Sequence, residues 1–106
     1  MDEKPLFTAL LKDRTIEDGS VARFDVRVRG KPSPEVTWYK DNKKIQPENF
    51  PHIKVLSQDD LHSILITDGK YEDAGVYKCV AKNNAGETSC VGHLFVEGKY
   101  WILIGT

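Results

Sequence analysis

The sequence has no excess of charge of either sign and no long apolar run. Its 106 residues include 15 basic and 16 acidic side chains, for a formal net charge of -1. Surfaces that bind nucleic acid or anionic membranes usually carry a clear basic excess, so neither partner is expected. No apolar run approaches the roughly 18 residues that a membrane span needs. The composition therefore indicates a single globular domain whose partners are neither nucleic acid nor membrane.

Residues that bind metals or perform catalysis are also few and scattered. The chain has two cysteines and three histidines, and they do not form the closely spaced sets that hold structural zinc. His52, His62 and His93 are expected at the surface or at strand edges, and only His93 is considered for a partner contact. No P-loop, Gly-x-Ser-x-Gly motif or other catalytic set is found. We predict no metal, no cofactor and no enzymatic activity.

Helical periodicity is missing, and strand periodicity takes its place. In "ARFDVRVR" (22–29), apolar residues alternate with charged ones, as in a strand with one buried and one solvated face. No segment sustains the i, i+3, i+4, i+7 spacing of an amphipathic helix. The sequence therefore predicts an all-β fold.

Several more short alternating segments are separated by turn residues. They are "LFTAL", "RTIE", "EVTWYK", "IKVL", "HSILI" and the two arms of "YKCVAKNNAGETSCVGHLFV". In the last of these, Asn84, Ala85 and Gly86 are expected to supply the positive φ angles of a tight turn. Seven or more short strands with turns between them predict a two-sheet sandwich.

Five landmarks, in this order, resemble the intermediate-set (I-set) immunoglobulin family. They are Gly19, "ARFDVRV", Gly30-Lys31-Pro32-Ser33-Pro34, Trp38 and Asp73-Ala74-Gly75-Val76-Tyr77-Lys78-Cys79. The resemblance is strongest to the intracellular variety found in titin, obscurin, the palladin group and myosin light-chain kinases. It implies an immunoglobulin-like Greek-key sandwich over residues 5–97, a leader at 1–4 and an apolar tail at 98–106. The core signature that it implies comprises Val26, Trp38, Asp73, Gly75, Tyr77 and Cys79.

Two positions depart from the family pattern. Val26 stands where the family usually has a cysteine facing Cys79, so the bridge between the sheets cannot form. Gly69 stands where the family generally has an apolar residue. Either Tyr71 fills the space that the apolar side chain would occupy, or the chain is loosely packed around Gly69.

The missing bridge predicts a reducing compartment. Where thiols are kept reduced a disulfide brings no stability, and a buried valine contributes about 1.5 to 3 kcal/mol instead. Cys79 then remains as a small buried apolar residue. Cys90 is expected nearly opposite Cys79 on the neighbouring strand, which leaves two interpretations: two reduced core thiols, or a redox pair.

Candidate partner-binding residues fall into two groups. An apolar strip is expected on the outer face of the sheet that carries Trp38 and Cys79. Its members are Tyr39, Val76, Val80, Val91 and Phe95. The tail adds Tyr100, Trp101, Ile102, Leu103 and Ile104. The tail could pack on the domain, add a strand to an open sheet edge, or be the stub of a neighbouring domain.

These features predict a non-enzymatic structural and protein-binding module of a sarcomeric or cytoskeletal scaffold. Its expected partners are other immunoglobulin-type or scaffold domains and neighbouring domains of the same chain, in the cytoplasm. Two alternatives share the fold: an extracellular adhesion or receptor domain, and an accessory domain beside a kinase or exchange-factor domain. Val26 and the absence of a glycosylation acceptor asparagine argue against the first alternative.

Overall fold

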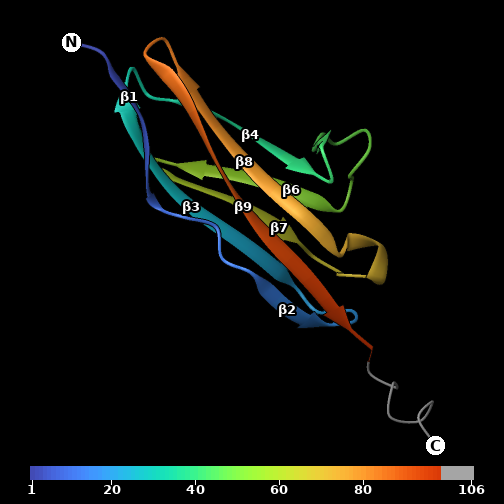
Figure 1. Cartoon of the computed structure of the whole chain (residues 1–106). Helices are drawn as coiled ribbons and strands as arrows, with labels where there is room; N and C mark the ends of the chain where they lie inside the picture. The colour runs from blue at the N-terminus through green and yellow to red at the C-terminus, as the bar shows by residue number, and fades with distance from the viewer. Residues whose placement is uncertain (99–106) are drawn as a thin grey trace, which may run out of the picture.

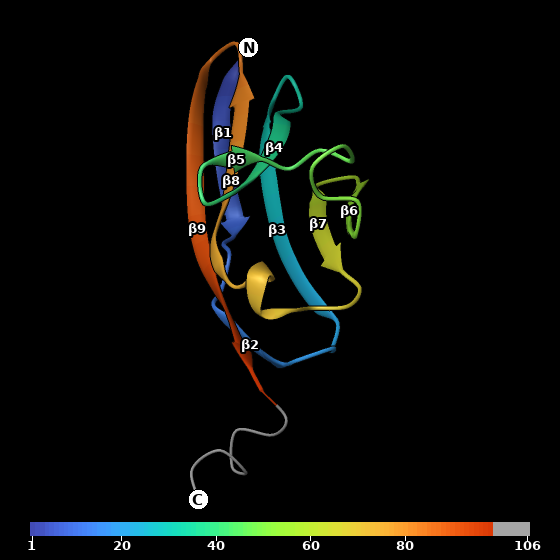
Figure 2. The same ribbon diagram turned by 90° about the vertical axis from the view of Figure 1, so that its right-hand side faces the viewer.

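The computed structural model describes residues 1–98 and arranges them in two β-sheets that face each other (Figures 1 and 2). The elements are β1 (Glu3–Ala9), β2 (Arg14–Glu17), β3 (Ala22–Lys31), β4 (Glu35–Lys40), β5 (Lys43–Lys44), β6 (Ile53–Gln58), β7 (Leu61–Ile66), the 3-10 turn η1 (Tyr71–Asp73), β8 (Gly75–Asn83) and β9 (Gly86–Glu97). The described residues include no helix that is long and apolar enough to cross a membrane.

The two sheets contain four and five strands. The four-stranded sheet has the order β1-β3-β7-β6, and the five-stranded sheet has the order β2-β9-β8-β4-β5. Every pairing is antiparallel except that of β2 with β9, which is parallel. The predicted all-β, two-sheet sandwich is confirmed.

The first strands divide the N-terminal stretch between the sheets. β1 pairs with β3, and after a short crossing segment β2 pairs with the end of β9. Leu11, in the crossing segment, is buried in the core and so anchors the passage of the chain from one sheet to the other. β1 begins at Glu3, inside the 1–4 segment that the sequence assigned to a leader.

The core lies between the sheets and follows the alternation seen in the sequence. In β3 the apolar residues are buried, whereas the arginines between them are exposed. Phe24 contacts Tyr77 of the opposite sheet, with ring centroids 5.0 Å apart. Val26 and Cys79 are both fully buried members of the same core cluster and lie on opposite sheets. Apolar packing therefore occupies the space where a bridge would lie.

The β8–β9 hairpin turns differently from the prediction. Asn83 pairs with Gly86, and its side-chain Oδ1 accepts hydrogen bonds from the backbone N–H groups of Ala85 (2.9 Å) and Gly86 (3.2 Å). None of residues 84–86 has a positive φ, so that prediction was wrong. Asparagine side chains commonly bond to the backbone two residues on in this way and so stabilise turns.

The space beside Gly69 is filled by Ile16. A Cβ added to Gly69 would lie 2.3 Å from Ile16 Cδ1. Gly69 also exchanges backbone hydrogen bonds with the turn after β2, through Ser20 O (2.9 Å) and Gly19 N (2.7 Å). Tyr71 is exposed and does not fill the space, and with Ile16 there the corner is not loosely packed. The two explanations suggested by the sequence were therefore wrong.

Candidate protein-binding surface

The structure brings most of the predicted strip together on the outer face of the five-stranded sheet. β4, β8 and β9 lie side by side there (Figure 1). Tyr39 and Val80 are partly exposed, and Val76, Val91 and Phe95 are exposed. We call these five residues the apolar strip.

A lysine lies in the middle of the apolar strip. The register places Lys78 of β8 opposite Tyr39 on one side and Val91 on the other. A hollow of about 230 Å³ beside it is lined by Asp41, Asn42, Val76, Lys78 and Val91. The surface therefore combines apolar and aromatic contact area, of the kind enriched at protein interfaces, with one central cation.

His93 is fixed at the edge of the strip. Its ring stacks on Phe95, with centroids 6.1 Å apart and planes inclined by 12°. Asp13 Oδ1 accepts a hydrogen bond from the His93 backbone N–H at 2.8 Å and lies 3.2 Å from the ring Nδ1. The His93 backbone N–H holds the pKa of Asp13 below its ordinary value, and the ring contact adds to this effect.

Asp41 shapes the other side of the strip. Its Oδ1 accepts from the Val76 backbone N–H at 3.0 Å, and its own N–H donates to Val76 O at 2.8 Å. The pKa of Asp41 is lowered, first by the Val76 N–H and then by Lys40. Gly75 has a φ of 153°, and a Cβ added to it would lie 2.7 Å from Asp41 Oδ2. Gly75 therefore leaves room for this carboxylate.

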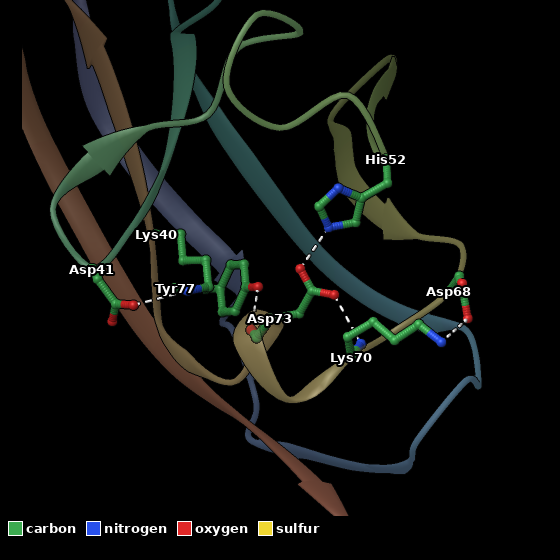
Figure 3. A network of polar contacts seen from close by, with 7 residues as sticks. All are labelled: Lys40, Asp41, His52, Asp68, Lys70, Asp73 and Tyr77. Carbon is green, nitrogen blue, oxygen red and sulfur yellow. Dashed lines mark hydrogen bonds and ion pairs between the residues drawn. The ribbon is translucent and has the colours of Figure 1, made fainter.

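Behind the strip, a polar network fixes the turn between β7 and β8 (Figure 3). The Tyr77 hydroxyl donates to the backbone carbonyl of Asp73, four residues upstream, at 2.6 Å. The Asp73 carboxylate is buried, and it accepts from the Lys70 backbone N–H at 2.9 Å. His52 Nε2 lies 2.5 Å from its other oxygen.

The contact of His52 was missed by sequence reasoning, which expected only a surface or edge residue. His52 lies 21 residues before Asp73, and no local pattern links the two positions. The available signal was the buried aspartate itself, because a buried carboxylate requires partners. The contact ties the loop before β6 to the turn before β8.

The two cysteines face each other across the β8–β9 ladder. Cys79 and Cys90 are register partners, and both are free thiols. Burial raises the pKa of both thiols, and Cys90 adds to the effect on Cys79. Little thiolate then forms near neutral pH, which disfavours disulfide formation. This does not decide between two reduced core thiols and a redox pair.

The remaining predicted residues are placed as follows. Trp38 is buried and pairs in register with Cys79. The tail residues Tyr100, Trp101, Ile102, Leu103 and Ile104 lie outside the described residues. Within residues 1–98, no cluster of histidine, cysteine and acidic side chains is arranged to hold a metal ion.

The order of the strands, the buried Tyr77 corner and the facing Val26 and Cys79 define an immunoglobulin-type sandwich. The immunoglobulin I-set domain model matches residues 5–96, and the chain belongs to this family. Two relatives are titin of Drosophila melanogaster, 39% identical over 95 residues and 90% of this chain, and the muscle M-line assembly protein unc-89 of Caenorhabditis elegans, 41% identical over 98 residues and 92% of this chain.

The chain is short beside these proteins. It covers 0% of that titin and 1% of unc-89, and at most 19% of the first curated relatives that it matches. Among solved structures, titin domains z1z2 in complex with telethonin align with a TM-score of 0.91 and 26% identity, over 93% of this chain and 50% of that one. A complex of titin M10 with an obscurin-like 1 immunoglobulin domain aligns with a TM-score of 0.85 and 27% identity, over 91% and 96%.

Proposed function

We propose that this domain is a non-enzymatic structural and protein-binding module of a sarcomeric or cytoskeletal scaffold. The observation that carries the proposal is the relationship to titin and unc-89 over almost the whole domain. Two structural relatives are titin immunoglobulin domains held in complexes, one with telethonin and one with an obscurin-like immunoglobulin domain. These complexes support a protein partner of the immunoglobulin or scaffold kind.

The apolar strip is the docking surface that we propose. It offers aromatic and aliphatic side chains around Lys78, and two fixed groups, His93 and Asp41, border it. Ordered borders reduce the side-chain entropy that binding would otherwise remove. The strip also lies on the outer face of the five-stranded sheet, away from the core between the sheets.

The arrangement of the terminal strands supports a mechanical role. β2 runs parallel to the end of β9, with four register pairs from Arg14–Leu94 to Glu17–Glu97. The start of the chain and the end of β9 lie at opposite ends of the domain (Figure 1). β1 precedes β2 and pairs with β3, so tension reaches β2 once β1 is released; it then pulls β2 and β9 in opposite directions along their axes and loads their ladder in shear.

The binding part of the proposal is tested by affinity capture from muscle lysate. The intact chain, a Val91→Lys variant and a Val55→Lys variant serve as baits. Both valines are exposed on strands, but only Val91 belongs to the strip. We expect a captured partner to be lost with Val91→Lys and kept with Val55→Lys. Equal capture by all three baits would exclude the strip.

The tail is tested in the same experiment with a chain that ends at Glu97. Loss of the partner from this shorter bait would assign the tail a binding role, and unchanged capture would remove it from the proposal.

A cytoplasmic location is part of the same proposal. Val26 in place of a bridging cysteine fits a reducing compartment. The test is to localise a tagged full-length parent protein in muscle cells, where we expect a sarcomeric or cytoskeletal pattern. Secretion or surface staining would favour an extracellular adhesion role instead.

A further inference from the structure

The edges of the two sheets are not equally protected. An exposed edge presents unpaired N–H and C=O groups, and proteins block such edges with short strands, lysine, proline, bulges or a covering segment. β5 has only two residues, both lysine. β1 carries Pro5 and two irregularities in its register with β3. These two edges are therefore poor sites for adding a strand.

The edges of the five-stranded sheet near β9 are protected as well. β2 has four residues and is charged at both ends, by Arg14 and Glu17. Where β9 extends beyond β2, the crossing segment lies against it, because a Cβ on Gly92 would lie 3.2 Å from both Leu11 Cβ and Lys12 O. The uncovered start of β4 follows Pro34 and begins with Glu35.

β6 is the exception. It is six residues long, it pairs with β7 in unbroken register, and its outer edge has no neighbouring strand among the described residues. It contains no proline, and Lys54 is its only charged residue. Val55 and Leu56, on its two faces, are 51% and 44% exposed. A mostly apolar groove of about 480 Å³ runs along it, lined in part by Ile45 and Pro51.

The charges at the two ends of β6 indicate what the edge can accept. Lys54 lies near its start, and the acidic turn Asp59–Asp60 follows its end, where Asp60 pairs with Arg27 at 2.7 Å and Asp59 has no ion-pair partner among the described residues. A second β6 laid antiparallel to the first brings the lysine of each copy toward the acidic turn of the other. A parallel arrangement would instead place like charges together. The favourable contact occurs twice, as in a two-fold symmetric interface.

The side chains also fit this arrangement. Residues paired across antiparallel strands share a face, and the two registers that pair the most residues of β6 cross at its central residues, Val55 or Leu56. Lys54 then lies opposite Leu56 or Gln58 of the second copy, and never opposite its own equivalent. Both registers are free of like-charge pairs.

We propose that β6 is a self-association edge, where two copies of the domain pair β6 with β6 antiparallel and join their four-stranded sheets into one. This surface lies on the opposite sheet from the apolar strip and goes beyond the proposed function. The shared strand edge is small, so the association is weak and concentration-dependent.

Sedimentation velocity over a concentration series tests the proposal. The chain is expected to form dimers that dissociate on dilution. Val55→Lys and Leu56→Lys, on the two faces of β6, should each weaken the association at least tenfold. Lys54→Glu should also weaken it at low salt. Circular dichroism melting shows which variants remain folded. Because Val55→Lys and Leu56→Lys both replace exposed residues, the test stays valid if one of these two variants does not fold.

Val91→Lys is the matched control, since it places the same change on an exposed strand residue of the other sheet. It should leave the dimer intact. The proposal is overturned if the chain stays monomeric at all concentrations, if Val91→Lys alone dissolves the dimer, or if assembly continues past two copies. It is also overturned if a chain that ends at Gly98 no longer associates while the full chain with Val55→Lys still does. A purely monomeric chain would leave the proposed partner binding untouched.

Discussion

Single buried side chains determine how this domain is stabilised. Val26 is fully buried against the opposite sheet, where it shares the core cluster with Cys79 and Trp38. Because no sulfur bridge connects the sheets, stability at this point depends on close apolar packing. Changes at these residues should therefore affect the free energy of unfolding more than changes at the surface.

Val26→Ala is expected to lower the free energy of unfolding by about 2 to 3 kcal/mol. The change removes two buried methyl groups, each worth about 0.8 kcal/mol, and leaves a cavity. Urea denaturation measures the difference. Val21→Ala, at an exposed valine, is the control and should change stability little. Equal effects at the two positions would show that the core does not depend on Val26.

Tyr77→Phe is expected to lower the free energy of unfolding by about 1 kcal/mol, since it removes the hydroxyl bond to Asp73 O and leaves that carbonyl without its donor. The exposed Tyr71 provides the control Tyr71→Phe. If thermal melts of the two variants coincide, the Tyr77 bond contributes nothing to the turn.

Stability is expected to fall at alkaline pH. Burial raises the pKa of Cys79 above its ordinary value of 9.0 and that of Tyr77 above 10.0. The folded state therefore favours the neutral forms, and this contribution is complete below about pH 9 and is lost as the pH rises. Urea denaturation between pH 7 and pH 10.5 should show the decline, and Cys79→Ala should reduce it. A free energy of unfolding that stays constant over this pH range would contradict the prediction.

At the scale of elements, local patterns predicted the strands better than the contacts between them. The alternation in 22–29 predicted β3, since side-chain period reports which face is buried. The contacts of Gly69 with Ile16, and of His52 with Asp73, join positions distant in sequence, so periodicity carries no information about them. The parallel pairing of β2 was missed for the same reason.

The conformation of the turns was also harder to predict from local patterns than the strands. Asn83 was not expected to accept two backbone hydrogen bonds at the β8–β9 turn, because the presence of a glycine in the turn favoured a left-handed residue there. Among hairpin turns, the positive φ angles occur instead at Asp41, Asn42 and Asp59, in the two shorter hairpins. Asparagine and aspartate tolerate this conformation, so composition alone does not distinguish the two kinds of turn.

Gly75→Ala is expected to destabilise the start of β8 by about 1 to 3 kcal/mol. The added methyl group would meet the Asp41 carboxylate at a backbone angle that favours glycine. Gly86→Ala is a suitable comparison, because its Cβ would meet only the flexible Lys4 side chain, at 3.3 Å. Chemical denaturation should separate the two variants, and equal stability would show that the Asp41 contact adapts without loss.

At the scale of the whole molecule, the two faces of the sandwich have different properties. The five-stranded sheet presents the apolar strip and contains the β2–β9 ladder that tension would load. The four-stranded sheet presents arginines and ends in the unprotected edge of β6. One domain can therefore bear force through its ends while one face binds a partner and the other edge contacts a second copy.

Single-molecule extension of the chain, pulled by its ends with and without a thiol reductant, tests the central claim most directly. The claim is that close packing, without a sulfur bridge, makes this domain a tension-bearing unit. We expect one abrupt, reversible unfolding step that releases the same length of chain in both conditions. Gradual lengthening without discrete steps, or a shorter release in the absence of reductant, would contradict the account.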